Sequence, residues 1–90
     1  MKRLHEAAAG TENKEDLRVS VRPGSGKIEI TVHSTVGVLF GKQIERAARD
    51  LLEQYGIEDC VMEIEDTSAL DYVVRARIET ALRRGLEGAE

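Results

Sequence analysis

The stretch LRVSVRPGSGKIEITVH (residues 17–33) contains two runs in which apolar and polar side chains alternate. The apolar members recur at every second position: Leu17, Val19, Val21, Ile28, Ile30 and Val32. This period predicts two β-strands, each with one buried face. Pro-Gly-Ser-Gly between them predicts a turn, because proline fixes one dihedral and glycine permits positive φ. We therefore expect strands over 17–22 and 27–33 that pair as an antiparallel hairpin with a polar outer face, on which His33 is exposed.

A helix is expected after this hairpin, from about Gln43 to Tyr55. Its apolar residues fall on one stripe of a helix: Ile44, Ala47, Ala48, Leu51, Leu52 and Tyr55. Gly56 is expected to end the helix. The stretch before it, residues 34–43, is expected to be a connection whose apolar side chains cover one edge of the core: Val36, Val38, Leu39 and Phe40.

A third strand and a second helix complete the chain. Cys60, Met62 and Ile64 alternate with more polar neighbours, which predicts the strand. The helix lies within 66–84, where Asp66, Thr67 or Ser68 can cap it and Gly85 stops it. Its apolar stripe is Leu70, Val73, Val74, Ile78, Ala81 and Leu82.

The element order strand, strand, helix, strand, helix predicts an α+β fold. A helical crossover makes the second and third strands parallel if they are neighbours. We expect a two-layer sandwich in which both helices cover one face of a mixed three-stranded sheet. We divide the chain into a flexible arm (1–16), a single domain (17–85) and a frayed tail (86–90).

Composition narrows the classes of function. The chain has 90 residues, a net charge of −4 and only three aromatic residues. This argues against a nucleic-acid partner, which usually meets a basic surface with aromatic side chains on which bases can stack. No segment resembles a membrane span or a signal peptide, and no metal-ligand spacing is present. The single cysteine, Cys60, is expected to be a buried packing residue and fits a cytoplasmic protein.

No pattern indicates a catalytic site. A Ser–His–Asp set at a suggestive spacing is missing, and GVLFGKQ (37–43) lacks the spacing and the hydroxyl residue of a phosphate loop. We therefore expect a protein that does not itself catalyse a reaction.

The ordered set of motifs from about Ala7 to Arg84 resembles one family. The run STVGVLFGKQI (34–44) is followed by a helix, a strand and DTSALDYVVRARIETALRR (66–84), and Gly10-Thr11 precedes the first strand. This set is similar to the acyl carrier subunit, or gamma chain, of citrate lyase, and more distantly to the acyl carrier subunit of malonate decarboxylase.

The resemblance implies a function that composition does not show. Such subunits carry phosphoribosyl-dephospho-coenzyme A on a serine in the loop before the first strand. The thiol of this arm holds acetyl or citryl groups for an alpha subunit (acyl transferase) and a beta subunit (lyase), and a prosthetic-group transferase attaches the arm. The polar residues 11–16 would be its exposed anchor.

This sequence departs from the family at the attachment position, where the modified serine falls on Lys14. An amine cannot form the phosphodiester that a hydroxyl forms. Four explanations stay open: a homologue that has lost the arm, a sequence altered at this position, attachment at another hydroxyl (Thr11, then Ser25), or acylation of Lys14 by different chemistry.

The remaining site residues are arginines and an aspartate. We expect Arg75 and Arg77, with Asp16, to form a surface that contacts partner subunits or the arm, because guanidinium matches phosphate and carboxylate. The alternative is that these arginines pair with Asp71, Glu79 or a nearby glutamate. The rival hypothesis for the whole chain is an interaction or scaffolding domain of the same fold that lost the attachment serine.

Overall fold

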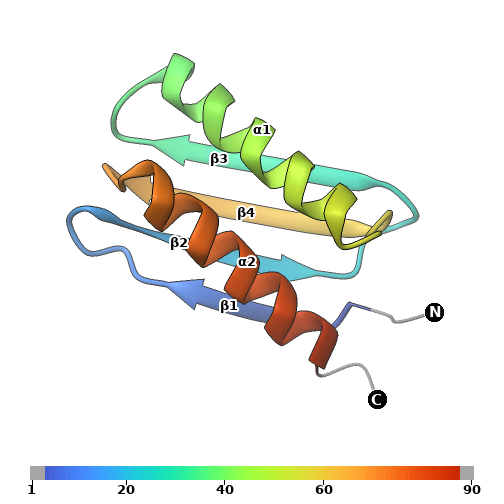
Figure 1. Cartoon of the computed structure of the whole chain (residues 1–90). Coiled ribbons are helices and arrows are strands. Elements are labelled where there is room, and N and C mark those ends of the chain that lie inside the picture. Colours follow the sequence, from blue (N-terminus) through green and yellow to red (C-terminus); the bar gives the residue numbers. More distant parts are fainter. Residues whose placement is uncertain (1–3, 88–90) are drawn as a thin grey trace.

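A computed structural model describes residues 4–87 of the chain. The elements follow one another as β1 (Ala7–Gly10), β2 (Asp16–Arg22), β3 (Ile28–Ser34), α1 (Val38–Gln54), β4 (Cys60–Thr67) and α2 (Asp71–Glu87). The strands form one mixed sheet in the order β1-β2-β4-β3. Both helices lie on the same face of this sheet (Figure 1). The two-layer α+β sandwich is therefore confirmed, with four strands where the sequence predicted three.

The expected hairpin between β2 and β3 is wrong, because β4 lies between them. β2 pairs with β4 in antiparallel register, and β3 pairs with β4 in parallel register. The Pro-Gly-Ser-Gly segment is thus a connection that passes the beginning of β4. The carboxylate of Asp59, one residue before β4, accepts hydrogen bonds from the backbone N–H groups of Gly24 and Gly26, each 3.0 Å long. A local turn signal cannot reveal that a distant strand inserts between its two arms.

The fourth strand comes from the segment that the sequence assigned to a flexible arm. Ala7–Gly10 pairs with β2 as an antiparallel hairpin, with Ala9 opposite Val19. Before it, the backbone N–H of His5 donates to the carbonyl of Gly85, and the side chain of Leu4 is buried. Four small residues carry no alternation, so β1 leaves no pattern in the sequence. Residues 1–3 of the predicted arm lie outside the described residues.

The core lies between the sheet and the two helices. Leu17, Val19 and Val21 of β2 are buried, as are Cys60, Met62 and Ile64 of β4, as predicted. The three apolar residues of β3 face the same way but are only half-buried, because β3 is an edge strand. Aliphatic side chains therefore fill the core, and Cys60 is one of its packing residues.

Both helices differ from expectation at their ends. α1 begins at Val38, five residues early, because Gly37 adopts a φ of 120° that a glycine tolerates and lets the chain leave β3. α2 begins at Asp71, since the carbonyl of Leu70 accepts the first helical hydrogen bond from Val74. It does not stop at Gly85 but continues to Glu87, so the predicted tail is partly helical; residues 88–90 lie outside the described part.

The buried stripe of α1 matches the prediction except at Tyr55, which lies just beyond the helix and is half-buried. In α2, Val74, Ile78, Ala81 and Leu82 are buried and Val73 is half-buried, whereas Leu70 lies just before the helix and is exposed. No helix in residues 4–87 is both long and apolar enough to cross a membrane.

Candidate functional site

Three connections meet at one end of the sheet, which we call the loop end. They are residues 11–15 between β1 and β2, residues 35–37 between β3 and α1, and residues 68–70 between β4 and α2. The strand pairing explains this arrangement. β1 and β3 run in the same direction as β4, so the three strands finish at the same end of the sheet. Figure 1 shows the three connections together, whereas the connection that contains Ser25 lies at the opposite end.

The connection between β1 and β2, residues 11–15, is fully exposed, and we call it the anchor loop. Each of its side chains, Lys14 included, belongs to an exposed residue. Gly10 enters the loop at a φ of 86°, and a Cβ built on it would overlap the carbonyl of Leu17. Only glycine fits this entry, because the two strands separate there at close range. The anchor loop is thus an open hairpin loop that leaves a tightly packed base.

Hydrogen bonds to β4 hold the backbone of the anchor loop. The N–H of Glu15 donates to the carbonyl of Thr67 over 2.6 Å, and the hydroxyl of Thr67 donates to the carbonyl of Glu12 over 3.4 Å. Glu15 adopts a φ of 64°, in the left-handed region where non-glycine residues are strained. The loop therefore has a defined backbone, while its residues, Lys14 among them, are exposed to solvent.

Asp16 and Arg77 form the base of the anchor loop. The Arg77 guanidinium donates from Nε to Oδ1 over 3.0 Å and from Nη2 to Oδ2 over 3.3 Å. Thr11 Oγ1 also donates to Oδ2, and the N–H of Leu17 donates to Oδ1. Led by the Arg77 hydrogen bond, these donors lower the pKa of Asp16 to about 2, against an opposing effect of burial. The carboxylate is therefore ionised at neutral pH and fixed in position.

A second carboxylate, Asp66, ties the other two connections together. It is 2% exposed, and its oxygens accept hydrogen bonds from Ser34 Oγ over 2.8 Å and from the N–H of Ala69 over 2.9 Å. The hydroxyls of Thr35 and Ser68 lie 3.3 Å apart above it. Asp66 was predicted as one of three possible caps of the last helix; it caps the connection before α2 and not α2 itself, which begins at Asp71. Asp66 continues the series of every second residue begun by Cys60, Met62 and Ile64, and this spacing indicates that it is buried.

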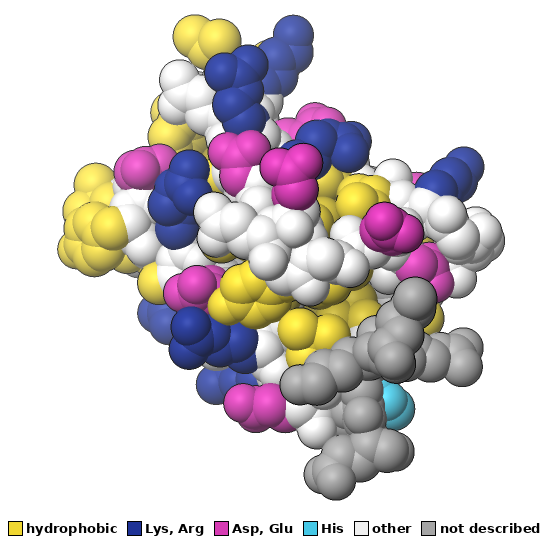
Figure 2. All heavy atoms as spheres, turned by 45° about the vertical axis from the view of Figure 1, so that its right-hand side comes forward, with side chains coloured by type: hydrophobic (Ala, Val, Ile, Leu, Met, Phe, Trp, Pro, Cys, Tyr) yellow, Lys and Arg dark blue, Asp and Glu magenta, His cyan; other side chains and the backbone are white. Residues whose placement is uncertain are grey.

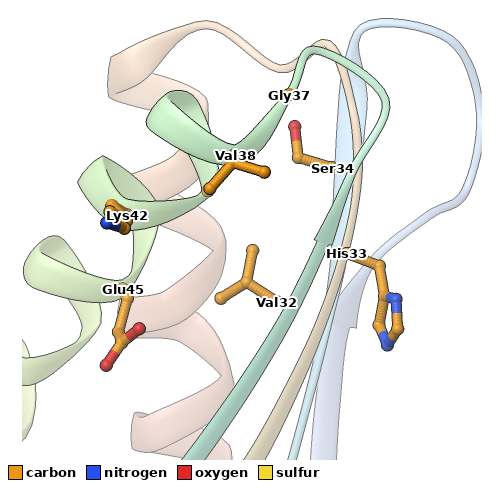
Figure 3. A pocket seen from close by; sticks show the side chains of 8 residues that line it. Val32, His33, Ser34, Gly37, Val38, Lys42 and Glu45 are labelled. Carbon is orange, nitrogen blue, oxygen red and sulfur yellow. The ribbon is translucent and has the colours of Figure 1, made fainter.

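A groove opens between β3 and the first turns of α1. It has a volume of about 410 Å³ and is lined by Val32, His33, Ser34, Gly37, Val38, Gly41, Lys42 and Glu45. Figure 3 shows Val32 pointing between the strand and the helix, whereas the imidazole of His33 points to the other side of the sheet. His33 is exposed, as predicted for a strand histidine on the polar face.

The predicted site residues fall into three groups. Lys14, Thr11 and Asp16 lie together with Arg77 at the anchor loop, so the ion pair of Arg77 is with Asp16 and not with the acidic residues expected on its own helix. Arg75 is exposed and forms no ion pair within residues 4–87. Ser25 lies at the opposite end of the sheet. The structure brings two of the three candidate positions into one loop and separates the third.

Comparison with known proteins places this arrangement in a family. Residues 4–85 match the family described as ACP: Malonate decarboxylase delta subunit (MdcD). A citrate lyase acyl carrier protein of Pectobacterium atrosepticum is 37% identical over 90 residues, which cover 100% of this chain and 94% of that protein. One of Rhodopseudomonas palustris is 41% identical over 87 residues, covering 97% and 90% of the two chains. The chain belongs to this acyl carrier family.

A chain of one solved structure has a similar fold. A chain in the crystal structure of a Pseudomonas malonate decarboxylase hetero-tetramer in complex with malonate superposes with a TM-score of 0.76 at 26% identity. The match covers 89% of this chain and 82% of that one. The resemblance inferred from the motifs is thus confirmed over nearly the whole chain.

The described residues do not form a metal site. Within residues 4–87, no three His, Cys, Asp or Glu side chains lie together in a way that could hold a metal ion. The loop end presents the exposed amine of Lys14, the hydroxyl of Thr11 and the carboxylates of Asp16 and Asp66, which hydrogen bonds hold in place.

Proposed function

We propose that this protein is the acyl carrier subunit of a citrate lyase-type complex. The anchor loop carries this proposal. It occupies the position at which the family resemblance places the attachment site, it is exposed along its whole length, and its base is fixed by Asp16 and Arg77. Acetyl and citryl thioesters on phosphoribosyl-dephospho-coenzyme A are what that resemblance implies for such a subunit.

The geometry of the anchor loop suits a carrier. A tethered acyl group must reach the attaching enzyme and then two active sites, so its anchor has to project from the body of the protein. A rigid anchor on a compact domain keeps the tethered group at high effective concentration near both sites. In this division of labour the partners catalyse: an alpha acyl transferase, a beta lyase and a prosthetic-group transferase. We place the subunit in the cytoplasm, which suits a single reduced and buried Cys60.

The residue at the attachment position does not fit the arm. Lys14 presents an amine, and a phosphodiester needs a hydroxyl. Thr11 supplies a hydroxyl in the same exposed loop, although its Oγ1 already donates to Asp16 over 2.8 Å and accepts from the N–H of Asn13 over 3.1 Å. Ser25 is exposed but lies at the end of the sheet remote from the anchor loop. Among the alternatives to Lys14, Thr11 is therefore favoured over Ser25.

Lys14 supports one rival function. A chain that keeps the fold and the loop end but has no hydroxyl at the attachment position suits an interaction subunit of the same complex that does not carry acyl groups. The two functions differ in one measurable property, which is the covalent state of the protein in its own cell.

Intact-mass spectrometry of protein purified from its native host tests the proposal. A carrier shows one covalent arm, and peptide mapping locates it on a residue of the anchor loop. The bare polypeptide mass, in cells that contain the attaching enzymes, contradicts the carrier function. Co-purification of lyase-like subunits with the bare chain then identifies it as the interaction subunit.

A further inference from the structure

The large apolar side chains that are exposed in residues 4–87 all lie at one end of the molecule. Their exposed fractions range from 54% to 79%, and they belong to the two connections beside the anchor loop or to the helix turns that follow them: Val36, Val38, Leu39, Leu70 and Tyr72. The sequence predicted that the first three would cover the core; the early start of α1 places them in solvent instead. Figure 2 shows hydrophobic side chains protruding from the margins of the molecule.

Hydrogen bonds link the three connections of the loop end to one another. The anchor loop bonds to Thr67 through Glu12 and Glu15. Ser68 follows Thr67 in the chain, and its Oγ lies 3.3 Å from Thr35 Oγ1. The N–H of Thr35 also donates to the carbonyl of Asp66. The two apolar groups, one at the start of each helix, are therefore held in a fixed relation to each other and to the anchor loop.

We propose that these five side chains form a docking surface for a catalytic subunit of the same complex. We call this set the apolar docking patch. Large exposed apolar side chains gathered at one end of a protein mark an interaction site, because water solvates them poorly and a partner removes them from it. The patch lies at the same end of the sheet as the anchor loop, with its α2 members on the side of β1 and β2, so a subunit that covers it approaches the end of the molecule that carries Lys14. The inference rests on the proposed function only in requiring partner subunits; it does not require an arm.

Charge at the border of the patch indicates the chemistry of the partner. Lys42 on α1 and Arg75 on α2 are exposed near the two apolar groups, and within the described residues neither takes part in an ion pair. The carboxylate of Asp71 lies instead in the first turn of α2, where it faces the positive end of the helix. We expect the partner to present an apolar centre with carboxylates opposite Lys42 and Arg75.

The groove beside α1 makes part of this surface concave. Val38 belongs both to the apolar docking patch and to the lining of the groove, and Lys42 lies one turn further along the same wall (Figure 3). A side chain of the partner can enter this hollow, with Val32 and Gly41 on its inner side. Interfaces usually concentrate their binding energy at such pockets next to apolar anchors.

Binding of the purified chain to the transferase and lyase subunits of its own organism tests the proposal. The chain is made without the arm-attaching enzymes, so that any affinity belongs to the protein surface. We expect the double variant Leu39→Ser/Tyr72→Ser to raise the dissociation constant at least about tenfold. Lys42→Glu should raise it about threefold or more, through repulsion of the partner's carboxylates.

Two matched controls lie far from the loop end. Lys27→Glu makes the same charge change before β3, and Gln54→Ser makes a polar change at the last residue of α1; both positions are exposed. Each should leave the dissociation constant unchanged within about twofold. Thermal unfolding of every variant shows that the fold persists, which is expected because none of the substituted side chains belongs to the core.

Three results would overturn the proposal. If the wild-type chain binds a subunit and the patch variants bind equally well, the docking surface is elsewhere while the proposed function stands. Failure of the wild-type chain to bind either subunit refutes both. If the chain alone is a dimer that Leu39→Ser/Tyr72→Ser converts to monomer, the patch joins two copies of this chain and not a catalytic subunit.

Discussion

The guanidinium of Arg77 and the carboxylate of Asp16, 61 residues apart in the chain, are joined by hydrogen bonds of 3.0 and 3.3 Å. This contact fastens the middle of α2 to the first residue of β2, directly below the anchor loop. The Asp16 side chain is 14% exposed and that of Arg77 is 43% exposed. In its exposure the pair is therefore intermediate between a surface ion pair, which contributes little to stability, and a buried ion pair.

The first prediction concerns the acid stability that this pair confers. Because the folded pKa of Asp16 is about 2 and its ordinary value is 3.8, the ionised carboxylate stabilises the fold above about pH 4. That contribution is lost as the pH falls from about 4 to 2. Arg77→Met keeps the stem but removes the donors, and should lower the free energy of unfolding by about 1 kcal/mol at pH 7.

Urea unfolding across this pH range measures the effect. The variant's stability should depend less steeply on pH between 2 and 4 than that of the wild type, and carbon NMR should show the Asp16 pKa moving up. Arg75→Met, on the exposed face of the same helix, is the matched control and should change neither quantity. An unaltered Asp16 pKa in Arg77→Met would show that Thr11 and Leu17 alone hold the carboxylate.

The second prediction concerns backbone strain in the anchor loop. Glu15 has a φ of 64°, and an L residue in this left-handed region costs about 1–2 kcal/mol. Glycine adopts this conformation without a steric penalty, although it gains more entropy on unfolding. Glu15→Gly should therefore raise the free energy of unfolding by about 0.5–1 kcal/mol. Lys14→Gly, at a neighbouring position without positive φ, should lower it slightly. Denaturant melts of the two variants compare the effects directly, and equal losses of stability would argue against strain at Glu15.

The sequence predicted elements well wherever one face is buried and one is solvated. Alternation located β2, β3 and β4, and the helical stripe located most of α1, because solvent and core alternate around these segments. The order of the strands in the sheet could not be predicted from alternation, which shows only which face of a strand is buried. β4 enters between β2 and β3, and the contact that fixes this crossing, between Asp59 and the backbone of Gly24 and Gly26, joins residues more than thirty positions apart.

A third prediction compares two helical glycines whose surroundings differ. Gly85 is buried in α2, and a Cβ on it would lie 2.9 Å from the carbonyl oxygen of His5 and 2.7 Å from the Leu4 side chain. A Cβ on Gly41 in α1 would meet only Val32, at 3.9 Å. Alanine is the better helix former by about 1 kcal/mol. Gly41→Ala should therefore stabilise the protein by roughly 0.5–1 kcal/mol, whereas Gly85→Ala should destabilise it by about 1–3 kcal/mol through the clash with the N-terminal segment.

Calorimetric melting of both alanine variants checks this prediction. The contrast also tests the docking of residues 4 and 5 against α2, which the sequence did not reveal. If Gly85→Ala were as stable as the wild type, that N-terminal segment would have to move away from the helix at little cost.

The fourth prediction concerns the single thiol. Burial raises the pKa of Cys60 to about 11 from its ordinary 9.0, so the folded state favours the neutral thiol. The stabilisation is fully present below about pH 9 and is lost as the pH rises towards 11. A thiol reagent at pH 8 should react with the native chain much more slowly than with the urea-unfolded chain, and because Cys60 is the only cysteine, all the signal reports on it. Rapid labelling of the native protein would mean that β4 opens readily.

The sequence predicted the exposed loop of the candidate site but not the contacts that hold it. The polar run 11–16 predicted an exposed loop, which the structure confirms for residues 11–15, and the family resemblance predicts a role for it. The partner of Arg77 was not predictable, because helical spacing favoured acidic residues on α2, whereas the actual partner is the first residue of β2, 61 positions earlier in the chain. The exposure of Val36, Val38 and Leu39 was also missed, because an apolar residue in a connection is equally compatible with covering the core and with meeting a partner.

The last prediction restores the hydroxyl at the attachment position. Lys14 is exposed in a loop whose backbone is held by Thr67, so serine at this position should leave the fold unchanged. If the loop end still matches the surface that the attaching enzyme recognises, Lys14→Ser should gain the mass of one arm when it is produced together with a transferase that modifies citrate lyase acyl carrier proteins. The unsubstituted chain should gain none at Lys14, since an amine cannot form the phosphodiester.

Intact mass and peptide mapping read out this experiment, and two further variants locate the reacting hydroxyl. Lys14→Ser/Ser25→Ala should be modified as fully as Lys14→Ser, because Ser25 lies at the other end of the sheet. If the wild-type chain is modified, loss of the arm in Thr11→Ala identifies Thr11 as the attachment residue, and an arm that persists in this variant is attached elsewhere. If Lys14→Ser folds normally and stays bare, the loop end has lost more than the serine, which favours the interaction subunit over the carrier.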